Sequence, residues 1–437
     1  MSVIKSNGAG SGASGFYKGV ATQSLRFNDD DSAVLSKTFS SAGDRRLWTF
    51  ATWFKISEIG DGALFAAFQT SAKRDVIRIL SGVINFQIVK TGISTINSNT
   101  TMVFRDPSAW YHLVVQYNSA DSTETNRTKM WVNGVQQTLS EIVGQNVESH
   151  FGHSQYHAIG ARRTDTGNYD LPFDGYYADT YYVNGQALDY TSFAEFKNGV
   201  LIPKKYTGSY GTNSFRLEYN QTGTGTASSS TIGADTSGEG NHLTSTNVVA
   251  SDCNMPDSPE NNFSTMNTLD KVDSVLAEGS LKTTGAGNSF DTVRSTFAMP
   301  SGSWYAEFLC HAGTGNGNNH VGISTQSEAL SGISGSNFLG SSATSYSYSD
   351  NDNVYNNGSI TNSTGTTYTA GDIIGVTFTG SEIKWYKNNS LIATVSSITG
   401  NDYCFTTTSY STSMGMFANF GQDSSFAGAK TAQGNTD

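Results

Sequence analysis

The sequence predicts an all-β protein made of two tandem antiparallel β-sandwich domains of the jelly-roll type. The first observation is a hairpin pattern that occurs twice, in residues 129–136 and in residues 383–392, more than 200 residues apart. The turns are Asn133-Gly134 and Asn388-Asn389, and these residue types tolerate the positive φ that a two-residue hairpin turn requires. Because an alternating segment precedes each hairpin, at 110–117 and at 371–378, we expect a similar sheet in each half.

Composition is the second observation. The chain has 437 residues, of which only 14% are charged and 12% are aromatic, with 46 Gly. Low charge, many turn residues and many aromatic residues are typical of short strands joined by turns, and the length favours two or three domains. Segments with helical periodicity are scarce, and only residues 190–196 predict a short helix.

Charge and hydropathy exclude several functions. The net charge of −11 argues against nucleic acid as a partner, because an extended phosphate-binding surface would need basic clusters. The longest apolar stretches, such as 63–68, are far shorter than the roughly 20 residues of a membrane helix, so we expect no membrane insertion. Residues 1–8 lack the apolar core of a signal peptide. A protein of this kind that works outside a cell is expected to leave by lysis or on a particle.

The three cysteines give no disulfide framework and no metal-binding spacing, because Cys253, Cys310 and Cys404 are few and far apart. Cys310 lies in an alternating segment, where we expect it to be a small buried hydrophobic residue on a strand.

Composition along the chain predicts four parts. Residues 1–22 form an N-terminal arm with a Gly-rich stretch, which is either a flexible tail or an attachment peptide that orders against a neighbouring subunit. Residues 23–220 carry repeated strand patterns separated by turns and predict the first sandwich. Residues 221–270 are rich in Gly, Ser, Thr and Pro and predict an extended connector, and residues 271–437 predict the second sandwich.

Each half then resembles a known family. The first half resembles the concanavalin A-like lectin/glucanase superfamily in its laminin-G-like form, through residues 110–115, the hairpin at 131–135 and the segment 173–185. The second half resembles a SPRY domain in four segments: 304–307, 371–376, 385–388 and 419–422.

In order, these segments resemble structural proteins of marine tailed phages. The resemblance implies a non-enzymatic virion protein, namely a tail fibre, spike or capsid-associated fibre, that projects from the particle and binds host-surface glycan or protein. It also implies contacts between the arm and other virion proteins, a homotrimer, and a location on the outside of the virion. Similar proteins continue beyond the stretch that matches residues 423–437, which implies a missing or processed carboxyl-terminal piece. A purely structural decoration protein is the open alternative.

A polysaccharide hydrolase is the second alternative, because the first superfamily includes glucanases. Retaining hydrolysis needs two carboxylates about 5 to 5.5 Å apart, which positions i and i+2 of one strand would supply. No Glu in this sequence has Glu or Asp two residues downstream. No Gly-x-Ser-x-Gly elbow lies between a strand and a helix either. We therefore expect no enzymatic activity.

Metal binding rests on weak patterns. His150, His153 and His157 would line one face of a helix, but their neighbours predict turn and strand, where this spacing does not converge. Residues 350–353 lack the oxygen pattern of an EF-hand loop. No cofactor is expected, with calcium as the open alternative, because laminin-G-like domains often hold calcium at a loop rim. The candidate ligands are Asp29, Asp31, Asp174 and Asp179.

Tyrosines are the candidate ligand-binding residues, since their rigid faces stack on sugars or on partner loops at little entropic cost. Two groups stand out in the sequence: Tyr169, Tyr176, Tyr177 and Tyr181 in the first half, and Tyr346, Tyr348 and Tyr355 in the second. Alternate residues of a strand face the core, so we expect about half of these tyrosines to be packing residues.

Overall fold

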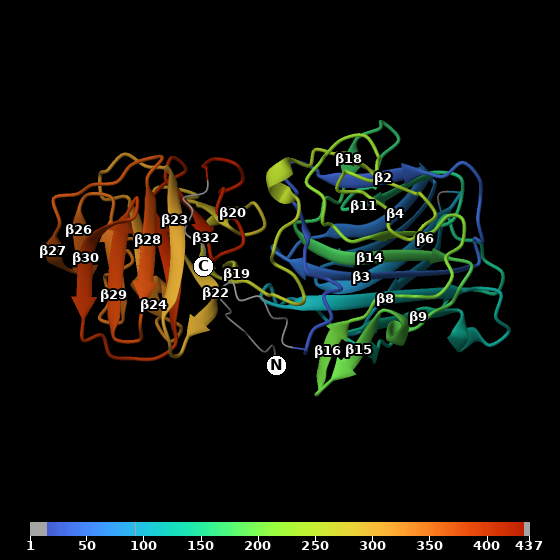
Figure 1. Cartoon of the computed structure of the whole chain (residues 1–437), viewed down its shortest axis with the longest axis horizontal. Helices are drawn as coiled ribbons and strands as arrows, with labels where there is room; N and C mark the ends of the chain where they lie inside the picture. Colours follow the sequence, from blue (N-terminus) through green and yellow to red (C-terminus); the bar gives the residue numbers. More distant parts are fainter. Residues whose placement is uncertain (1–14, 92, 432–437) are drawn as a thin grey trace. The chain divides into compact units, whose positions relative to one another are not determined.

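A computed structural model describes residues 15–91 and 93–431, and the fold class predicted from the sequence is confirmed. The described chain consists of β-strands and four single-turn 3₁₀ helices, and it divides into two compact units between Asn262 and Phe263 (Figure 1). Each unit contains two seven-stranded antiparallel sheets.

The first unit is a sandwich of two large sheets. The first sheet has the order β1-β14-β3-β8-β9-β10, with β17 also paired to β14, and the second has the order β18-β2-β11-β4-β5-β6-β7. The strands of the first sheet are β1 (Leu25–Phe27), β14 (Gly175–Asn184), β3 (Leu47–Ile56), β8 (Trp110–Asn118), β9 (Thr128–Val132), β10 (Val135–Gln136) and β17 (Phe215–Leu217). Those of the second are β18 (Thr244–Thr246), β2 (Val34–Thr38), β11 (Tyr156–Ile159), β4 (Gly62–Thr70), β5 (Lys73–Leu80), β6 (Val83–Lys90) and β7 (Ile93–Asn99).

Aromatic side chains fill the space between these two sheets. Phe50 from the first sheet stacks on Phe65 from the second with ring centroids 4.8 Å apart, and Phe65 stacks on Phe151 at 4.5 Å. Trp48 is fully buried and stacks on Tyr117 at 5.0 Å. Because each buried aromatic ring contributes about 1.5–3 kcal/mol, this core is the main source of stability of the first unit.

Both predicted hairpins are present. Asn133 and Gly134 have φ values of 51° and 78° and connect β9 to β10. Asn388 and Asn389, with φ values of 47° and 69°, connect two strands of the second unit, β29 (Glu382–Lys387) and β30 (Ser390–Ser396). The turn residues therefore adopt the left-handed backbone conformation that Asn and Gly tolerate.

A third layer covers the outer face of the first sheet. The hairpin of β15 (Ala194–Lys197) and β16 (Val200–Pro203) brings Ala194 and Leu201 against Trp53, Trp110 and Tyr176. The short helix predicted for residues 190–196 is limited to one turn, η2 (Tyr190–Ser192). The prediction was wrong for the rest, because Ala194–Lys197 pairs with β16 as a strand.

The described part of the predicted arm packs on this same unit. The backbone N–H groups of Gly19, Val20 and Ala21 donate to the carboxylate of Glu260 at 2.7–3.1 Å. Lys197 donates to the carbonyl of Phe16 at 2.8 Å, and Ala21 is buried. Residues 1–14 of the predicted arm lie outside the described residues.

The segment predicted as an extended connector, 221–270, is divided between the two units. Its part up to Asn262 belongs to the first unit, where β18 pairs with β2 and buried ion pairs hold the following residues. Arg26 pairs with Asp252 on η3 (Ala250–Asp252) at 2.9 Å, and Lys55 pairs with Asp257 at 2.9 Å. All four side chains are at most 3% exposed, so this part of the segment is integral to the first sandwich.

The second unit is also a sandwich of two sheets, ordered β19-β22-β31-β24-β25-β26-β27 and β20-β21-β32-β23-β28-β29-β30. Trp385 on β29 is fully buried and donates from Nε1 to the carbonyl of Val321 on β24 at 2.9 Å, so it joins the two sheets. The strands of the first of these sheets are β19 (Met266–Val272), β22 (Asp291–Met299), β31 (Tyr403–Ser409), β24 (Asn319–Thr325), β25 (Ser345–Ser349), β26 (Asn353–Asn356) and β27 (Ser359–Ser363). The remaining strands of the second are β20 (Val275–Ala277), β21 (Lys282–Thr284), β32 (Gly415–Asn419), β23 (Trp304–Ala312) and β28 (Ile373–Phe378).

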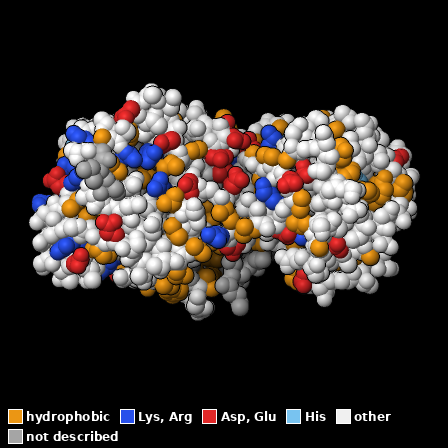
Figure 2. Space-filling model, turned by 180° about the vertical axis from the view of Figure 1, so that it is seen from behind, with side chains coloured by type: hydrophobic (Ala, Val, Ile, Leu, Met, Phe, Trp, Pro, Cys, Tyr) orange, Lys and Arg blue, Asp and Glu red, His pale blue; other side chains and the backbone are white. Residues whose placement is uncertain are grey.

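The three cysteines are free and buried. Cys310 is fully buried on β23, which confirms its expected role as a small core residue. No helix within the described ranges has the length and apolar character needed to cross a membrane. Uncharged polar side chains and backbone make up most of the face drawn in Figure 2, where charged side chains are scattered.

Candidate functional site

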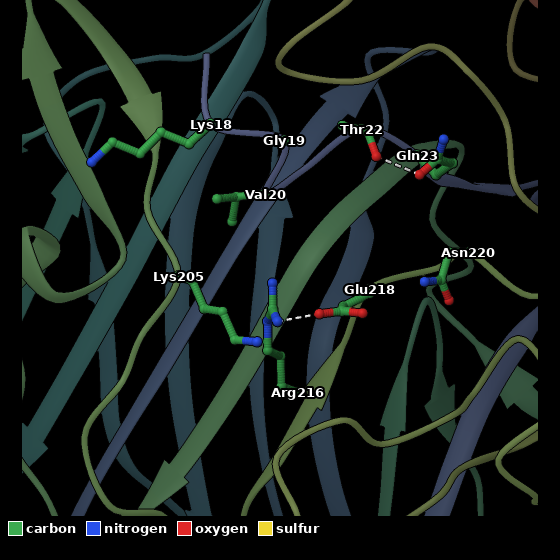
Figure 3. A pocket seen from close by; sticks show the side chains of 9 residues that line it. All are labelled: Lys18, Gly19, Val20, Thr22, Gln23, Lys205, Arg216, Glu218 and Asn220. Carbon is green, nitrogen blue, oxygen red and sulfur yellow. Dashed lines mark hydrogen bonds and ion pairs between the residues drawn. The ribbon is translucent and has the colours of Figure 1, made fainter. Parts of the chain in front are cut away.

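A cavity of about 350 Å³ lies in the first unit, beside the N-terminal segment and the end of β17 (Figure 3). Nine residues line it: Lys18, Gly19, Val20, Thr22, Gln23, Lys205, Arg216, Glu218 and Asn220. Figure 3 shows Lys205, Arg216 and Glu218 close together, whereas the side chain of Lys18 points away from them. Lys18 forms an ion pair with Glu195 at 2.5 Å.

The cavity is lined by charged side chains, of which Arg216 is the most buried. Arg216 is 2% exposed, pairs with Asp179 at 2.8 Å and also contacts the carboxylate of Glu218. Glu218 is the single acid among the nine lining residues. A glycoside hydrolase needs two carboxylates across its cleft, so this cavity does not supply the constellation that the hydrolase alternative requires.

Asp179 was predicted as a calcium ligand and Tyr181 as a ligand-binding residue, and the structure places both in this buried cluster. Asp179 sits at an irregularity of β14 with a φ of 44°. One carboxylate oxygen accepts from Arg216 at 2.9 Å and the other from the hydroxyl of Tyr181 at 2.9 Å. Burial raises the pKa of Asp179 to about 7, although Arg216 acts to lower it. Both predictions are therefore corrected, because the carboxylate of Asp179 and the hydroxyl of Tyr181 are buried and hydrogen-bonded to each other.

A second candidate is an acidic rim at the ends of three neighbouring strands, β1, β14 and β3. Phe27 pairs with Gly175, which pairs with Ile56, so Asn28, Asp174 and Ser57 continue this row beyond the ladder. The backbone N–H of Ser57 donates to the carbonyl of Asp174 at 3.1 Å. We define the acidic rim as Asn28, Asp29, Asp30, Glu58 and Asp174.

Two oxygens of the acidic rim have no partner. Asn28 and Asp174 are 4% and 8% exposed, and the Oδ1 atoms of both are buried without a hydrogen bond to any described residue. The amide nitrogen of Asn28 donates to Asp31 at 3.0 Å, which fixes the amide. Burial, followed by the charge of Asp29, raises the pKa of Asp174 well above its usual range. The structure thus places Asp29 near Asp174, whereas Asp31 is held by the amide of Asn28 and Asp179 lies in the cluster around Arg216.

The oxygen donors of the acidic rim are of the type that calcium prefers. Across residues 15–91 and 93–431, no three His, Cys, Asp or Glu side chains converge into a group able to hold a metal ion. An ion at the acidic rim would therefore depend on Asp174, on the amide oxygen of Asn28 and on oxygens from water or a ligand, since calcium takes roughly six to eight oxygens.

Four of the seven tyrosines predicted to bind a ligand are core residues. Tyr176, Tyr177 and Tyr348 are fully buried, and Tyr181 is 1% exposed. The reason on β14 is that both faces of the strand are covered, by the second sheet on one side and by the third layer on the other. A tyrosine in such a position cannot stack on a ligand, so these predictions are corrected.

The other three tyrosines, Tyr169, Tyr346 and Tyr355, are partly exposed. The hydroxyl of Tyr169 lies 2.8 Å from that of Tyr156. Tyr355 belongs to a cluster that the sequence did not predict, in which Phe338 stacks on His320 at 4.6 Å and contacts Tyr355 at 4.9 Å. The members come from three separate segments, so no local sequence pattern indicates the cluster.

The three closely spaced histidines do not form a metal site. His150 is tied through Nδ1 to the buried carboxylate of Asp75 at 2.9 Å, and His157 lies on β11. Burial lowers the pKa of His157 to about 4, so its ring is neutral at physiological pH. These residues are turn and strand residues, as the sequence indicated.

Comparison with known families supports the fold of the first unit. Residues 27–190 match the family model of the concanavalin A-like lectin/glucanases superfamily. No curated protein matches the chain.

Solved structures that resemble the chain include examples of both families named above. The SPRY domain of human HERC1 shares 17% identity, with a TM-score of 0.32, over 36% of this chain and 98% of that one. Domains LG4-5 of the mouse laminin alpha1 chain share 10% identity, with a TM-score of 0.33, over 94% of this chain and 85% of that one. A heptameric SAP-like pentraxin from Limulus polyphemus shares 15% identity, with a TM-score of 0.32, over 39% of this chain and 80% of that one.

Proposed function

We propose that this chain is a non-enzymatic binding protein whose first sandwich contacts host-surface glycan at the acidic rim. The observation that carries the proposal is the pair of buried, unpartnered oxygens of Asn28 and Asp174, next to Asp29. A cation at this position would satisfy both oxygens and offset the repulsion between the two carboxylates. Its remaining coordination positions would be open to the hydroxyl groups of a sugar.

The proposed setting is the outside of a phage particle, as part of a tail fibre, spike or capsid-associated fibre. The order of sequence motifs along the chain supports this setting. Single contacts between a sandwich and a glycan are weak, so copies joined in a homotrimer would raise the avidity without any new contact. The arm would attach the chain to the particle or to sister subunits.

The acidic rim is tested by calcium titration of the full chain. We expect calcium at a hundredfold excess over its dissociation constant to stabilise the first unit by about 2.7 kcal/mol, which corresponds to a rise in melting temperature of about 5–10 °C. Asp174→Asn should abolish this rise. The matched control is Glu124→Gln, which removes an exposed carboxylate from η1 (Glu124–Asn126), and it should retain the rise.

Glycan arrays probed with and without EDTA complete the test. Calcium-dependent binding that is lost in Asp174→Asn supports the proposal. A calcium-independent melting temperature together with blank arrays would reject glycan binding at the acidic rim and favour a structural decoration protein.

A further inference from the structure

A group of arginines lies on the outer face of the second sheet of the first unit. Arg74 and Arg78 flank Val76 on β5, and the intervening Ile77 points into the core. Arg162 lies near both of them, on a separate hairpin of β12 (Arg162–Arg163) and β13 (Tyr169–Asp170) that packs against β4. We call Arg74, Arg78 and Arg162 the arginine face.

Three carboxylates, Asp170, Asp61 and Asp165, lie near the arginine face, and Asp170 forms an ion pair with it. Asp170 binds Arg162 through both oxygens, at 2.8 and 2.6 Å. The two other nearby carboxylates accept backbone N–H groups, Asp61 from Ser81 and Asp165 from Ser71, each at 2.9 Å.

Arg74 has unused hydrogen-bonding capacity. Its Nε is buried and has no hydrogen-bond partner among the described residues. Burial, and next the charge of Arg162, lowers the pKa of both Arg74 and Arg78. An anion placed here would relieve the repulsion among the three guanidinium groups and supply the missing acceptor.

Amide side chains continue this face across β6 and β7. Arg78 is opposite Asn85, which is opposite Asn99, and in the next row Gln87 is opposite Asn97. Asn85 accepts from Arg78 at 2.9 Å and donates to Asn97 and Asn99 at 2.9 and 2.8 Å. The row therefore has fixed orientations, and it exposes Asn97 and part of Gln87 and Asn99 to solvent. Amides are suited to sugar hydroxyl groups because they both donate and accept.

We propose that the arginine face and the adjoining amide row bind an anionic polysaccharide, one that carries sulfate or carboxylate groups. Guanidinium groups bind such anions through paired hydrogen bonds, and the amides would bind hydroxyl groups of neighbouring sugars. The net charge of −11 and the small number of arginines on this face argue against duplex nucleic acid, which requires an extended set of phosphate contacts. This second surface is independent of the acidic rim and adds a ligand class to the proposed function.

The test uses two matched polymers and the full chain. Dextran sulfate and unsubstituted dextran share a backbone and differ in sulfate, and polygalacturonate provides the carboxylate arm. We expect binding of dextran sulfate or polygalacturonate, in EDTA and at low salt, with no binding of dextran. Binding should weaken as salt is raised, because exposed charges are screened.

Substitutions assign that binding to the arginine face. Loss of a charge-assisted contact should weaken binding about tenfold in Arg74→Gln and roughly a hundredfold in the Arg74→Gln/Arg78→Gln double variant. The matched control Arg46→Gln removes an exposed arginine of the loop before β3 and should bind like the unaltered chain. Unchanged melting temperatures would show that the variants fold.

Three outcomes would overturn the inference: no binding of either anionic polymer, equal losses in Arg46→Gln, or duplex DNA bound as tightly as dextran sulfate. None of them bears on the acidic rim, because these measurements are made in EDTA. Failure of calcium binding at Asp174 would likewise leave the arginine face unaffected.

Discussion

His320 gives the second unit a specific dependence on pH. The residue is 2% exposed on β24, with its ring nitrogens 3.2 Å from the hydroxyl of Ser347 and from the carbonyl of Gly317. Burial lowers the pKa of His320 from 6.5 to about 3, and the hydrogen bond to Gly317 opposes this shift only in part. In the unfolded chain the ring takes up a proton near pH 6.5, whereas the folded chain resists protonation down to about pH 3.

The magnitude follows from the difference between these two pKa values. Because the folded-state pKa is the lower one, the stabilising effect is complete above pH 6.5 and is lost as the pH falls from 6.5 toward 3. At pH 4.5, two units below the unfolded pKa, the His320 ring is protonated in the unfolded chain and neutral in the folded chain. This difference lowers the free energy of unfolding by about 2.7 kcal/mol, at about 1.36 kcal/mol per unit.

The assay compares the full chain with His320→Gln by urea unfolding at pH 7.5 and 4.5. Hydrogen exchange of the β24 amides reads the second unit separately. We expect the free energy of unfolding to fall by about 2.7 kcal/mol more in the unaltered chain than in the variant. Other titrating groups, such as Asp350, are present in both proteins and cancel. Equal losses would mean that water reaches the ring in the folded state, which contradicts the burial argument.

Three further predictions concern the first unit. Arg26→Met should destabilise it by about 3–5 kcal/mol in urea unfolding, because Asp252 keeps a buried charge without its guanidinium; the double change with Asp252→Leu should recover much of this loss. Tyr177→Phe should cost about 1–2 kcal/mol by the same measurement, since its hydroxyl donates to the buried carbonyl of Leu64 at 3.0 Å, and no loss would show that the carbonyl finds another donor. In EDTA at pH 7, Asp174→Asn should raise the melting temperature, because burial and Asp29 raise the pKa of this carboxyl and its charged form opposes folding; a lower melting temperature would contradict that sign.

Local signals in the sequence predicted the strands and turns well, but they could not predict what covers each sheet. The Asn-Gly and Asn-Asn turns determine their hairpins through the backbone preferences of these residues, so both hairpins could be predicted from the sequence. The burial of Tyr176 depends on Ala194, on the next hairpin, and on Met255, which lies far away in the chain. Alternation therefore separates the side chains of β14 into two faces, but it does not show that both faces are buried.

The candidate sites show the same division. The approach of Asp29 to Asp174 was expected from the resemblance to laminin-G-like domains, and the structure places the two residues near each other. The arginine face was missed, although Arg74 and Arg78 stand four apart on a strand and so share a face. Arg162 completes the cluster, because its hairpin packs against β4. That long-range contact has no local signal in the sequence.

The ion pairs of Arg26 and Lys55 have a consequence for the synthesis of the chain. Both basic side chains belong to strands made early, whereas their carboxylates, Asp252 and Asp257, are added some 200 residues later. In a nascent chain that ends just after β17, these two cations must stay hydrated, because burying a charge without a counter-ion is costly. The first domain should consequently finish folding only when residue 257 has left the ribosome, and a fragment cut at residue 220 should be prone to aggregate.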